Sequence, residues 1–148
     1  MRFLPLTMSG EIIIDEAPLK LDHNSLLERL HKKNCGAVVS FLGITRGQDN
    51  GEEIIRLEFD AWQEQLGTTL HKLAQLAIDK FGVSNIAMAH RTGSVAPEES
   101  IVSIHVASRH RKEAFVACEW LIDELKAQAP IWKKEVSKSG ERWKQGLG

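Results

Sequence analysis

The spacing of the apolar residues along this chain changes several times between two residues and three to four residues. This pattern restricts the possible folds most strongly. Helical spacing is clearest over residues 62–81 and from about residue 109 or 110 to residue 128. A shorter helix is expected after Ser25, which begins a Ser-Leu-Leu-Glu capping box, with Gly36 as its stop. Pro130 would end the last helix, because the residue before a proline avoids helical geometry.

Five further segments have the composition or the alternation of β-strands: residues 11–14, 36–42, 53–60, 85–90 and 100–107. Residues 36–42 are almost continuously apolar, which predicts a strand covered on both faces. Residues 53–60 alternate, with Ile55, Leu57 and Phe59 on one side, which predicts a half-exposed strand. The order of strands and helices predicts an α+β domain with helices packed on a largely antiparallel sheet, and the first six elements are compatible with a ferredoxin-like unit.

The length and composition point to one globular domain over residues 1–148. Hydrophobic residues make up 43% and charged residues 26%, which excludes disordered and low-complexity classes. No apolar run approaches the roughly 20 residues of a membrane span, and the first residues lack the apolar core of a secretory signal. Cys35 and Cys118 are far apart and in apolar settings, as expected of free thiols in a reducing cytosol. We therefore expect a cytoplasmic protein without a membrane anchor.

Basic residues are concentrated near the C-terminus, although the net charge of the whole chain is only −1. Residues 126–148 contain six lysines and arginines but only two acidic residues. This distribution indicates either a local site for an anion or a solvated basic tail. The near-zero net charge argues against a nucleic-acid-binding module, because such modules usually carry a broad basic surface.

The segment Ser-Arg-His-Arg-Lys, residues 108–112, is the most informative candidate site. It lies where a strand is expected to pass into the last helix, and free N–H groups and the helix dipole attract anions at such a position. Cations there are mildly unfavourable, by a few tenths to about 1 kcal/mol each. A phosphate or carboxylate gripped by an arginine would explain them. The alternative is that the bases point into water or pair with Glu113 and other acids.

Four other residues, in three places along the chain, could bring a cation to a binding site. Arg46 lies in a glycine-rich loop, residues 43–51, and would either close over a ligand or remain an exposed loop arginine. Lys126 lies at the border of the apolar stripe of the last helix, as either a partly desolvated amine or an ordinary last-turn lysine. Lys133 and Lys134 are consecutive in an extended segment, so one could enter a pocket while the other faces solvent.

Metal and cysteine chemistry are not indicated by the sequence. His90, His105 and His110 lack the paired spacing of a zinc site, and there is no Cys-x-x-Cys motif. Neither cysteine has a base beside it in the sequence, so a cysteine nucleophile has little support. We therefore expect no metal ligand among these residues.

The candidate cations occur in sequence blocks that resemble a known family: residues 36–46, 57–62, 90–93, 110–115 and 126–135. Each block alone is weakly specific, but their order and spacing from about residue 36 to residue 143 resemble the large, catalytic subunit of molybdopterin synthase, the MoaE family. The resemblance implies an α/β hammerhead fold and a homodimer. It also implies a small ubiquitin-like, MoaD-like partner subunit whose C-terminal Gly-Gly tail carries a thiocarboxylate, giving a heterotetramer.

The resemblance further implies a sulfurtransferase of molybdenum cofactor biosynthesis. The partner's tail would enter a pocket and deliver sulfur to cyclic pyranopterin monophosphate (precursor Z), forming the dithiolene of molybdopterin. No cofactor or metal would be needed, because sulfur arrives on the partner. The family's pocket residues fall on Arg46, His110, Arg111, Lys126 and Lys133.

The roles of these five residues follow from their chemistry once the resemblance is accepted. Arg111 and His110 suit the substrate phosphate, whereas Lys126 and Lys133 are candidates for catalysis by proton transfer and charge stabilisation. Lys126 is also expected to contact the carbonyl of the thiocarboxylate. The chain departs from the family in lacking a tyrosine in residues 57–62 and in its short C-terminus, which leaves open whether a neighbouring subunit's basic residue completes the pocket. A non-catalytic relative that only binds a partner is a further rival, after the nucleic-acid-binding module, and the joint presence of the five cations argues against it.

Overall fold

The computed structural model describes residues 10–15 and 19–144, which form helices and strands in the order expected of an α+β domain. Within these residues the elements are β1 (Glu11–Asp15), α1 (His23–Arg29), β2 (Ala37–Ile44), β3 (Gln48–Asp49), β4 (Glu52–Ala61), α2 (Gln63–Phe81), β5 (Asn85–His90), β6 (Gly93–Val95), β7 (Ser100–Ser108), α3 (Arg111–Gln128), β8 (Ile131–Ser137) and β9 (Gly140–Lys144).

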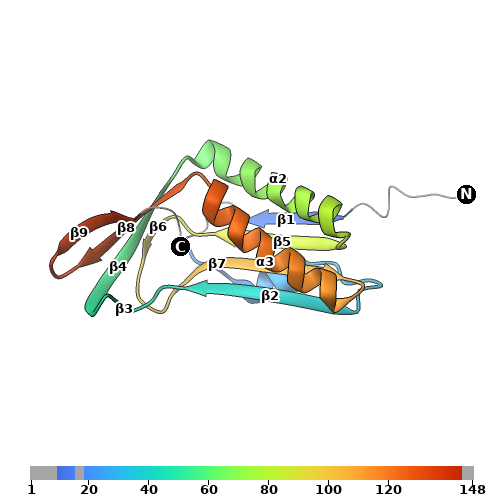
Figure 1. Cartoon of the computed structure of the whole chain (residues 1–148), viewed down its shortest axis with the longest axis horizontal. Coiled ribbons are helices and arrows are strands. Elements are labelled where there is room, and N and C mark those ends of the chain that lie inside the picture. The colour runs from blue at the N-terminus through green and yellow to red at the C-terminus, as the bar shows by residue number, and fades with distance from the viewer. Residues whose placement is uncertain (1–9, 16–18, 145–148) are drawn as a thin grey trace, which may run out of the picture.

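The strands form two sheets that meet near the C-terminal end of α3 (Figure 1). The first has the order β1-β5-β7-β2, in which only the β1–β5 pair is parallel. The second has the order β3-β4-β8-β9, with β6 also paired to β4. The predicted class, helices packed on largely antiparallel sheet, is confirmed. The predicted ferredoxin-like arrangement is wrong, because β4 belongs to the second sheet and does not pair with the strands of the first.

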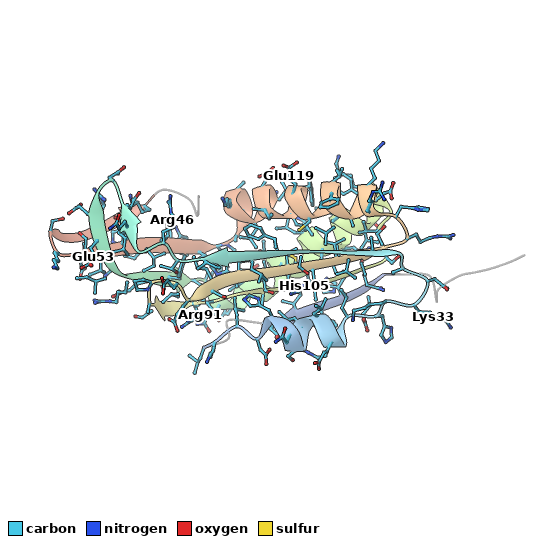
Figure 2. The ribbon with its side chains drawn as sticks, turned by 90° about the horizontal axis from the view of Figure 1, so that it is seen from below. Lys33, Arg46, Glu53, Arg91, His105 and Glu119 are labelled. Atoms are coloured by element: carbon cyan, nitrogen blue, oxygen red, sulfur yellow. The ribbon has the colours of Figure 1, made fainter. Side chains whose placement is uncertain are left out.

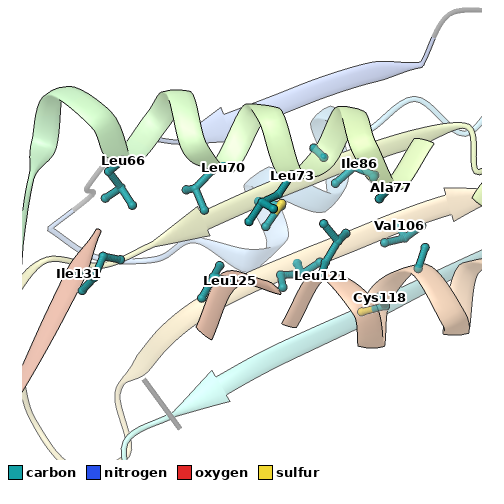
Figure 3. Packing of buried hydrophobic residues seen from close by; sticks show 14 of the residues in the cluster. Leu66, Leu70, Leu73, Ala77, Ile86, Val106, Cys118, Leu121, Leu125 and Ile131 are labelled. Atoms are coloured by element: carbon teal, nitrogen blue, oxygen red, sulfur yellow. The ribbon is translucent and has the colours of Figure 1, made fainter. Parts of the chain in front are cut away.

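Helices α2 and α3 lie side by side on one face of the four-stranded sheet and supply most of the core (Figures 1 and 3). Leu70 and Leu73 of α2 and Leu121 of α3 are completely buried against Ile86 of β5. Each such side chain stabilises the fold by about 1.5–3 kcal/mol through burial alone. Gly82 ends α2 in the left-handed conformation at φ 73°, as its position after the apolar stripe predicted.

Helix α1 covers the opposite face of the four-stranded sheet (Figure 2) and begins and ends earlier than the sequence suggested. Its N-cap is Asp22 rather than Ser25, because the Asp22 carboxylate accepts a hydrogen bond from the Ser25 N–H at 3.0 Å. The helix ends at Arg29, since Leu30 adopts an extended conformation and packs into a small second core with Leu26.

Strand β2 is covered on one face only, contrary to the prediction from its apolar composition. It is the edge strand of its sheet, and α1 contacts β5 and β7 instead. Val38, Leu42 and Ile44 therefore remain exposed on the face away from α3, whereas the alternate residues of β2 are partly buried.

Strand β4 contains an irregularity that shifts the predicted alternation. The pairing register with β8 changes between Ile54 and Arg56. As a result, Ile54 is buried and Ile55 is 44% exposed, so the prediction that Ile55 shares the buried side with Leu57 and Phe59 is wrong. Such an irregularity changes which face of the sheet the neighbouring side chains point to, and a regular two-residue alternation in the sequence does not predict it.

The basic and aromatic segment after Pro130 forms the β8–β9 hairpin, which the sequence indicated only as an extended segment. Strand β8 pairs along β4, so that Lys133 lies opposite Phe59 and Lys134 opposite Glu58. The hairpin extends away from the main body at the end of the second sheet (Figure 1). In the described part of the chain, no helix combines the length and apolar character needed to cross a membrane.

Candidate active site

A cavity of about 340 Å³ lies where the two sheets meet beneath the last turn of α3. Its walls are mainly apolar and come from β2, β4, β7 and α3; examples are Phe41, Leu57, Ile104 and Leu125. Apolar walls lower the local dielectric constant inside the cavity, and electrostatic interactions in a low-dielectric site are stronger than in bulk solvent. The cavity can therefore give a small number of polar groups a large effect on a bound ligand.

Three of the five predicted site residues line this cavity although they are distant in the sequence. Arg46 follows β2, Lys126 lies in the last turn of α3, and Lys133 lies on β8. Figure 2 shows Arg46 near the second sheet, at the end of the molecule where α3 finishes. The fold thus gathers three donors of hydrogen bonds and positive charge around one mainly apolar space, which favours an anionic ligand.

The alternation of β8 turns Lys133 inward. Lys133 and Glu135 lie on the cavity side, while Lys134 lies on the other face and forms ion pairs with Glu58 at 3.2 Å and Glu141 at 3.0 Å. The two consecutive lysines therefore point to opposite sides of the strand, as predicted. Lys134 also lies 5.5 Å from the ring centre of Trp143, which is exposed on that outer face.

Lys133 has the electrostatic surroundings expected of a group that exchanges protons. Its half-buried position lowers the pKa of its amine, and the nearby cations Lys144, Arg46 and Lys126 lower it further, whereas Glu135 opposes them. A lowered pKa increases the fraction of neutral amine near neutral pH. The amine can then act as either proton donor or proton acceptor at the cavity.

Two carboxylates on the cavity wall balance this positive charge, and sequence reasoning did not identify them. Glu135 is buried and accepts a hydrogen bond from Arg142 at 2.9 Å, with Lys144 at 3.6 Å. Asp49 accepts from Lys144 at 2.9 Å, and this hydrogen bond is the main reason that the pKa of the Asp49 carboxyl is lowered. The only signal for Glu135 in the sequence is its position two residues after Lys133, on the same face of a strand.

His110 and Arg111 lie at the other end of α3 and do not line the cavity. His110 is the N-cap and Arg111 the first residue of α3, and both are exposed. Lys126 is fifteen residues further along, which corresponds to about 22 Å at 1.5 Å per residue. Figure 1 shows α3 starting far from the second sheet and ending beside β8. One chain alone therefore assembles three of the five expected residues, not all five.

The two cysteines are free, and Cys118 is a buried residue of α3. Burial raises the pKa of the Cys118 thiol to about 11, which disfavours the reactive thiolate. This agrees with the sequence-based interpretation that Cys118 belongs to the apolar stripe. The chemistry of the site therefore rests on its cationic and polar side chains.

The fold and the cavity define an α+β domain whose site is built for an anionic ligand. Comparison with known proteins makes this class specific: the family model described as "MoaE protein" matches residues 14–128. The chain belongs to the MoaE family. The resemblance found in the sequence blocks is thereby confirmed.

Relatives across bacteria and archaea carry the same functional description. The molybdopterin synthase catalytic subunit of Pyrococcus abyssi is 34% identical over 137 residues, covering 93% of each chain. That of Bacillus subtilis is 32% identical over 130 residues, covering 88% of this chain and 82% of the relative.

Solved structures agree with these sequence relatives. Molybdopterin synthase from Staphylococcus aureus matches with a TM-score of 0.81 at 30% identity, covering 91% of this chain and 96% of the other. A complex of subunits 1 and 2 of the molybdopterin-converting factor from Helicobacter pylori matches with a TM-score of 0.70 at 32% identity, covering 89% and 88%. The predicted enzyme class is confirmed: this is the molybdopterin synthase catalytic subunit family, which acts in molybdenum cofactor biosynthesis.

Proposed function

We propose that the chain transfers sulfur from the thiocarboxylated C-terminus of a small ubiquitin-like subunit to cyclic pyranopterin monophosphate, forming the dithiolene of molybdopterin. The observation that carries this proposal is the cavity in which Arg46, Lys126 and Lys133 meet. A small-subunit partner is further supported by the Helicobacter pylori neighbour, which is a complex of two subunits of the molybdopterin-converting factor.

The cavity suits the end of an extended, glycine-rich tail. Its mainly apolar walls offer few polar partners to a side chain, and a Gly-Gly tail has no side chains to place there. The thiocarboxylate at the end of that tail is an anion, which Lys126 at the end of α3 and Arg46 after β2 can bind. We assign the contact with the thiocarboxylate carbonyl to Lys126.

The chemical step needs proton transfer and stabilisation of developing charge. In each transfer, sulfur of the thiocarboxylate forms a bond to a carbon of the pterin side chain, and the oxygen substituent of that carbon leaves, as water in one transfer and as the phosphate oxygen of the opened cyclic ester in the other. Water then cleaves the resulting thioester, returning the tail as a carboxylate and leaving the sulfur on the substrate. Lys133, whose amine has a lowered pKa, is suited to donate and accept the protons of these steps.

A second copy of the chain is needed to bring His110 and Arg111 to the substrate. They lie about 22 Å along α3 from Lys126, so they reach a bound phosphate only if a homodimer sets the start of one α3 beside the cavity of the other copy. We propose this arrangement, with one small subunit on each copy giving a heterotetramer. Arg111 would then bind the phosphate in two parallel hydrogen bonds.

We propose no resident cofactor or metal for this step, because the sulfur arrives on the partner and the required protons are supplied by side chains. We also place the protein in the cytoplasm. The support for this is the two free cysteines, Cys35 and Cys118, which suit a reducing compartment.

The test is a reconstituted reaction. The purified chain is mixed with a thiocarboxylated small subunit and the pyranopterin precursor, and the oxidised, fluorescent product is measured. We expect product from the wild type and from Lys138→Ala, a control because Lys138 is exposed on the β8–β9 turn. We expect none from Lys126→Ala, which should still fold and bind the small subunit. Undiminished turnover by Lys126→Ala would remove Lys126 from the mechanism, and no product from the wild type would refute the proposed function.

A further inference from the structure

His90 is a buried polar side chain on the cavity wall that the proposed reaction does not use. It is the last residue of β5, it is 2% exposed, and it lines the cavity. Its ring packs edge-on against Phe59, with ring centres 5.2 Å apart, and Phe59 lines the same cavity. A histidine held in this position is available to a ligand inside the cavity and shielded from bulk water.

The contacts of His90 determine which ring nitrogen carries the proton. Nδ1 lies 2.6 Å from the backbone oxygen of Arg91. A carbonyl oxygen can only accept a hydrogen bond, so Nδ1 must carry the proton and donate it. Burial holds the pKa of His90 at about 4, so the ring is neutral near pH 7 and Nε2 presents a lone pair. Among the described residues, Nε2 has no hydrogen-bond partner.

The backbone acceptor that holds this tautomer is itself fixed. The N–H of Arg91 donates to the oxygen of Ile101 at 2.8 Å. The Arg91 guanidinium donates to Glu99 at 3.3 Å and to the backbone oxygen of Ser94 at 2.8 Å. These bonds anchor the turn after β5, so the orientation of the His90 ring is built into the fold.

A second polar group faces the same cavity from across the sheet. His90 pairs with Val102 of β7, which pairs with Gly43 of β2, so the three form one row about 10 Å wide. Thr45, two residues beyond Gly43, is 1% exposed and lines the cavity. Within the described ranges 10–15 and 19–144, its hydroxyl oxygen has no hydrogen-bond partner. Two buried residues on this part of the wall, His90 and Thr45, thus each present a polar atom for which the described residues provide no hydrogen-bond partner.

His90 and Thr45 can supply hydrogen-bond acceptors, which the cations of the cavity lack. Arg46 and the protonated forms of Lys126 and Lys133 can only donate hydrogen bonds. The carboxylates of Asp49 and Glu135 are already engaged by Lys144 and Arg142. A ligand that carries N–H groups into this apolar space must find acceptors there, because an unpaired buried donor is costly.

We propose that His90 is a specificity-determining residue whose Nε2 accepts a hydrogen bond from an N–H group of the ligand in the cavity, with the Thr45 hydroxyl as a second polar contact. This inference rests on the proposed function, which supplies two ligands with such donors. One is the backbone amide of the partner's Gly-Gly tail, and the other is the ring or amino N–H of the pterin. Both present the same chemistry to Nε2.

Two substitutions at His90 separate the proposed ligand contact of Nε2 from the hydrogen bond that Nδ1 donates to the Arg91 oxygen. In His90→Asn, the amide nitrogen can still donate to the Arg91 oxygen, but nothing replaces Nε2. In His90→Gln, the longer side chain carries an amide to the region of Nε2 and restores an acceptor there. Binding of the thiocarboxylated small subunit and of the pyranopterin precursor is measured in two separate titrations, together with KM and kcat.

We expect His90→Asn to weaken binding of one ligand about tenfold and to raise its KM, with His90→Gln recovering most of the loss. A loss confined to the small-subunit titration assigns the contact to the tail amide, and one confined to the precursor titration assigns it to the pterin. Unchanged binding in both titrations overturns the inference. Equal losses in both His90 variants, accompanied by a lower melting temperature, also overturn it, because they indicate a purely structural role.

Thr45→Val provides a test that does not depend on the folding of the His90 variants. It keeps the shape of the side chain and removes only the hydroxyl, and we expect it to weaken the same ligand as His90→Asn by threefold or more. Unchanged affinity of Thr45→Val would remove Thr45 from the proposal. Failure of the wild-type chain to make product would refute the proposed function, whereas wild-type activity with an unaffected His90→Asn would refute only the role of His90.

Discussion

The neutral state of His90 makes a quantitative prediction about stability in mild acid. The pKa of this histidine is about 4 in the folded chain and 6.5 in the unfolded chain, and burial is the main cause of the difference. Between these values the unfolded chain binds a proton that the folded chain does not. The contribution of His90 to the free energy of unfolding is therefore fully present above pH 6.5, and it is lost as the pH falls from 6.5 toward 4.

The size of the effect follows from the two pKa values. From pH 7 to pH 5, the linkage relation gives a loss of about 2 kcal/mol in the free energy of unfolding for this one group. His90→Asn removes the titrating ring, so its stability should fall about 2 kcal/mol less over the same pH change. His105, whose pKa is also lowered to about 4, contributes equally to both proteins and cancels in the comparison.

The assay is urea unfolding at pH 7 and pH 5, followed by the fluorescence of the four tryptophans. His71→Asn is a matched control because His71 is exposed on α2, and its pH dependence should equal that of the wild type. Parallel losses of stability in wild type and His90→Asn would refute the reasoning. They would show that His90 is not held neutral by burial, and the argument for a free Nε2 would lose its basis.

Three further predictions test the site and its surroundings. Because burial and nearby cations lower the pKa of Lys133, product formation should rise with pH with an apparent pKa below 10.5, and Lys133→Arg should abolish this rise; an unchanged pH profile would contradict it. Arg111→Ala should weaken precursor binding at least tenfold and leave small-subunit binding intact, whereas equal effects on both would argue against a phosphate contact. Gly43→Ala should destabilise the fold by about 1–3 kcal/mol in urea unfolding, because its Cβ would clash with Cγ1 of Val102; unchanged stability would show that the Val102 side chain moves aside at little cost.

Local signals in the sequence were sufficient for the two long helices. The apolar stripe of residues 62–81 needed only Gly82 to end it, and α3 ends just before Pro130. These signals act on residues only a few positions away, so the helix ends can be predicted from the local sequence. The start of α1 was misplaced because the capping box at Ser25 predicts an N-terminus there, whereas in the fold the Asp22 carboxylate accepts a hydrogen bond from the Ser25 N–H and caps the helix.

Features set by distant contacts could not be predicted in the same way. The exposure of Ile55 depends on a register shift between β4 and β8, and the exposure of Leu42 depends on which strands α1 covers. Likewise, the ion pair of Lys144 with Asp49 joins residues 95 positions apart. None of these has a local sequence signal.

The candidate site was predictable in part. Arg46, Lys126 and Lys133 were identified from their sequence blocks, and the structure brings them to one cavity. His110 and Arg111 were expected in the same pocket, but the length of α3 separates them from it within a single chain. The acceptor role of His90 could not be anticipated, because it depends on a tautomer fixed by the folded backbone of Arg91.

The measurement that tests the central claim most directly is complementation between two impaired variants at a low precursor concentration. If the site combines Lys126 of one copy with Arg111 of the other, a dimer of Lys126→Ala with Arg111→Ala contains one intact site and one doubly altered site. Random pairing of equal amounts should then restore about a quarter of wild-type product formation. Product no higher than that of either variant alone would contradict the account, because it would place both residues in the same chain's site or in separate functions.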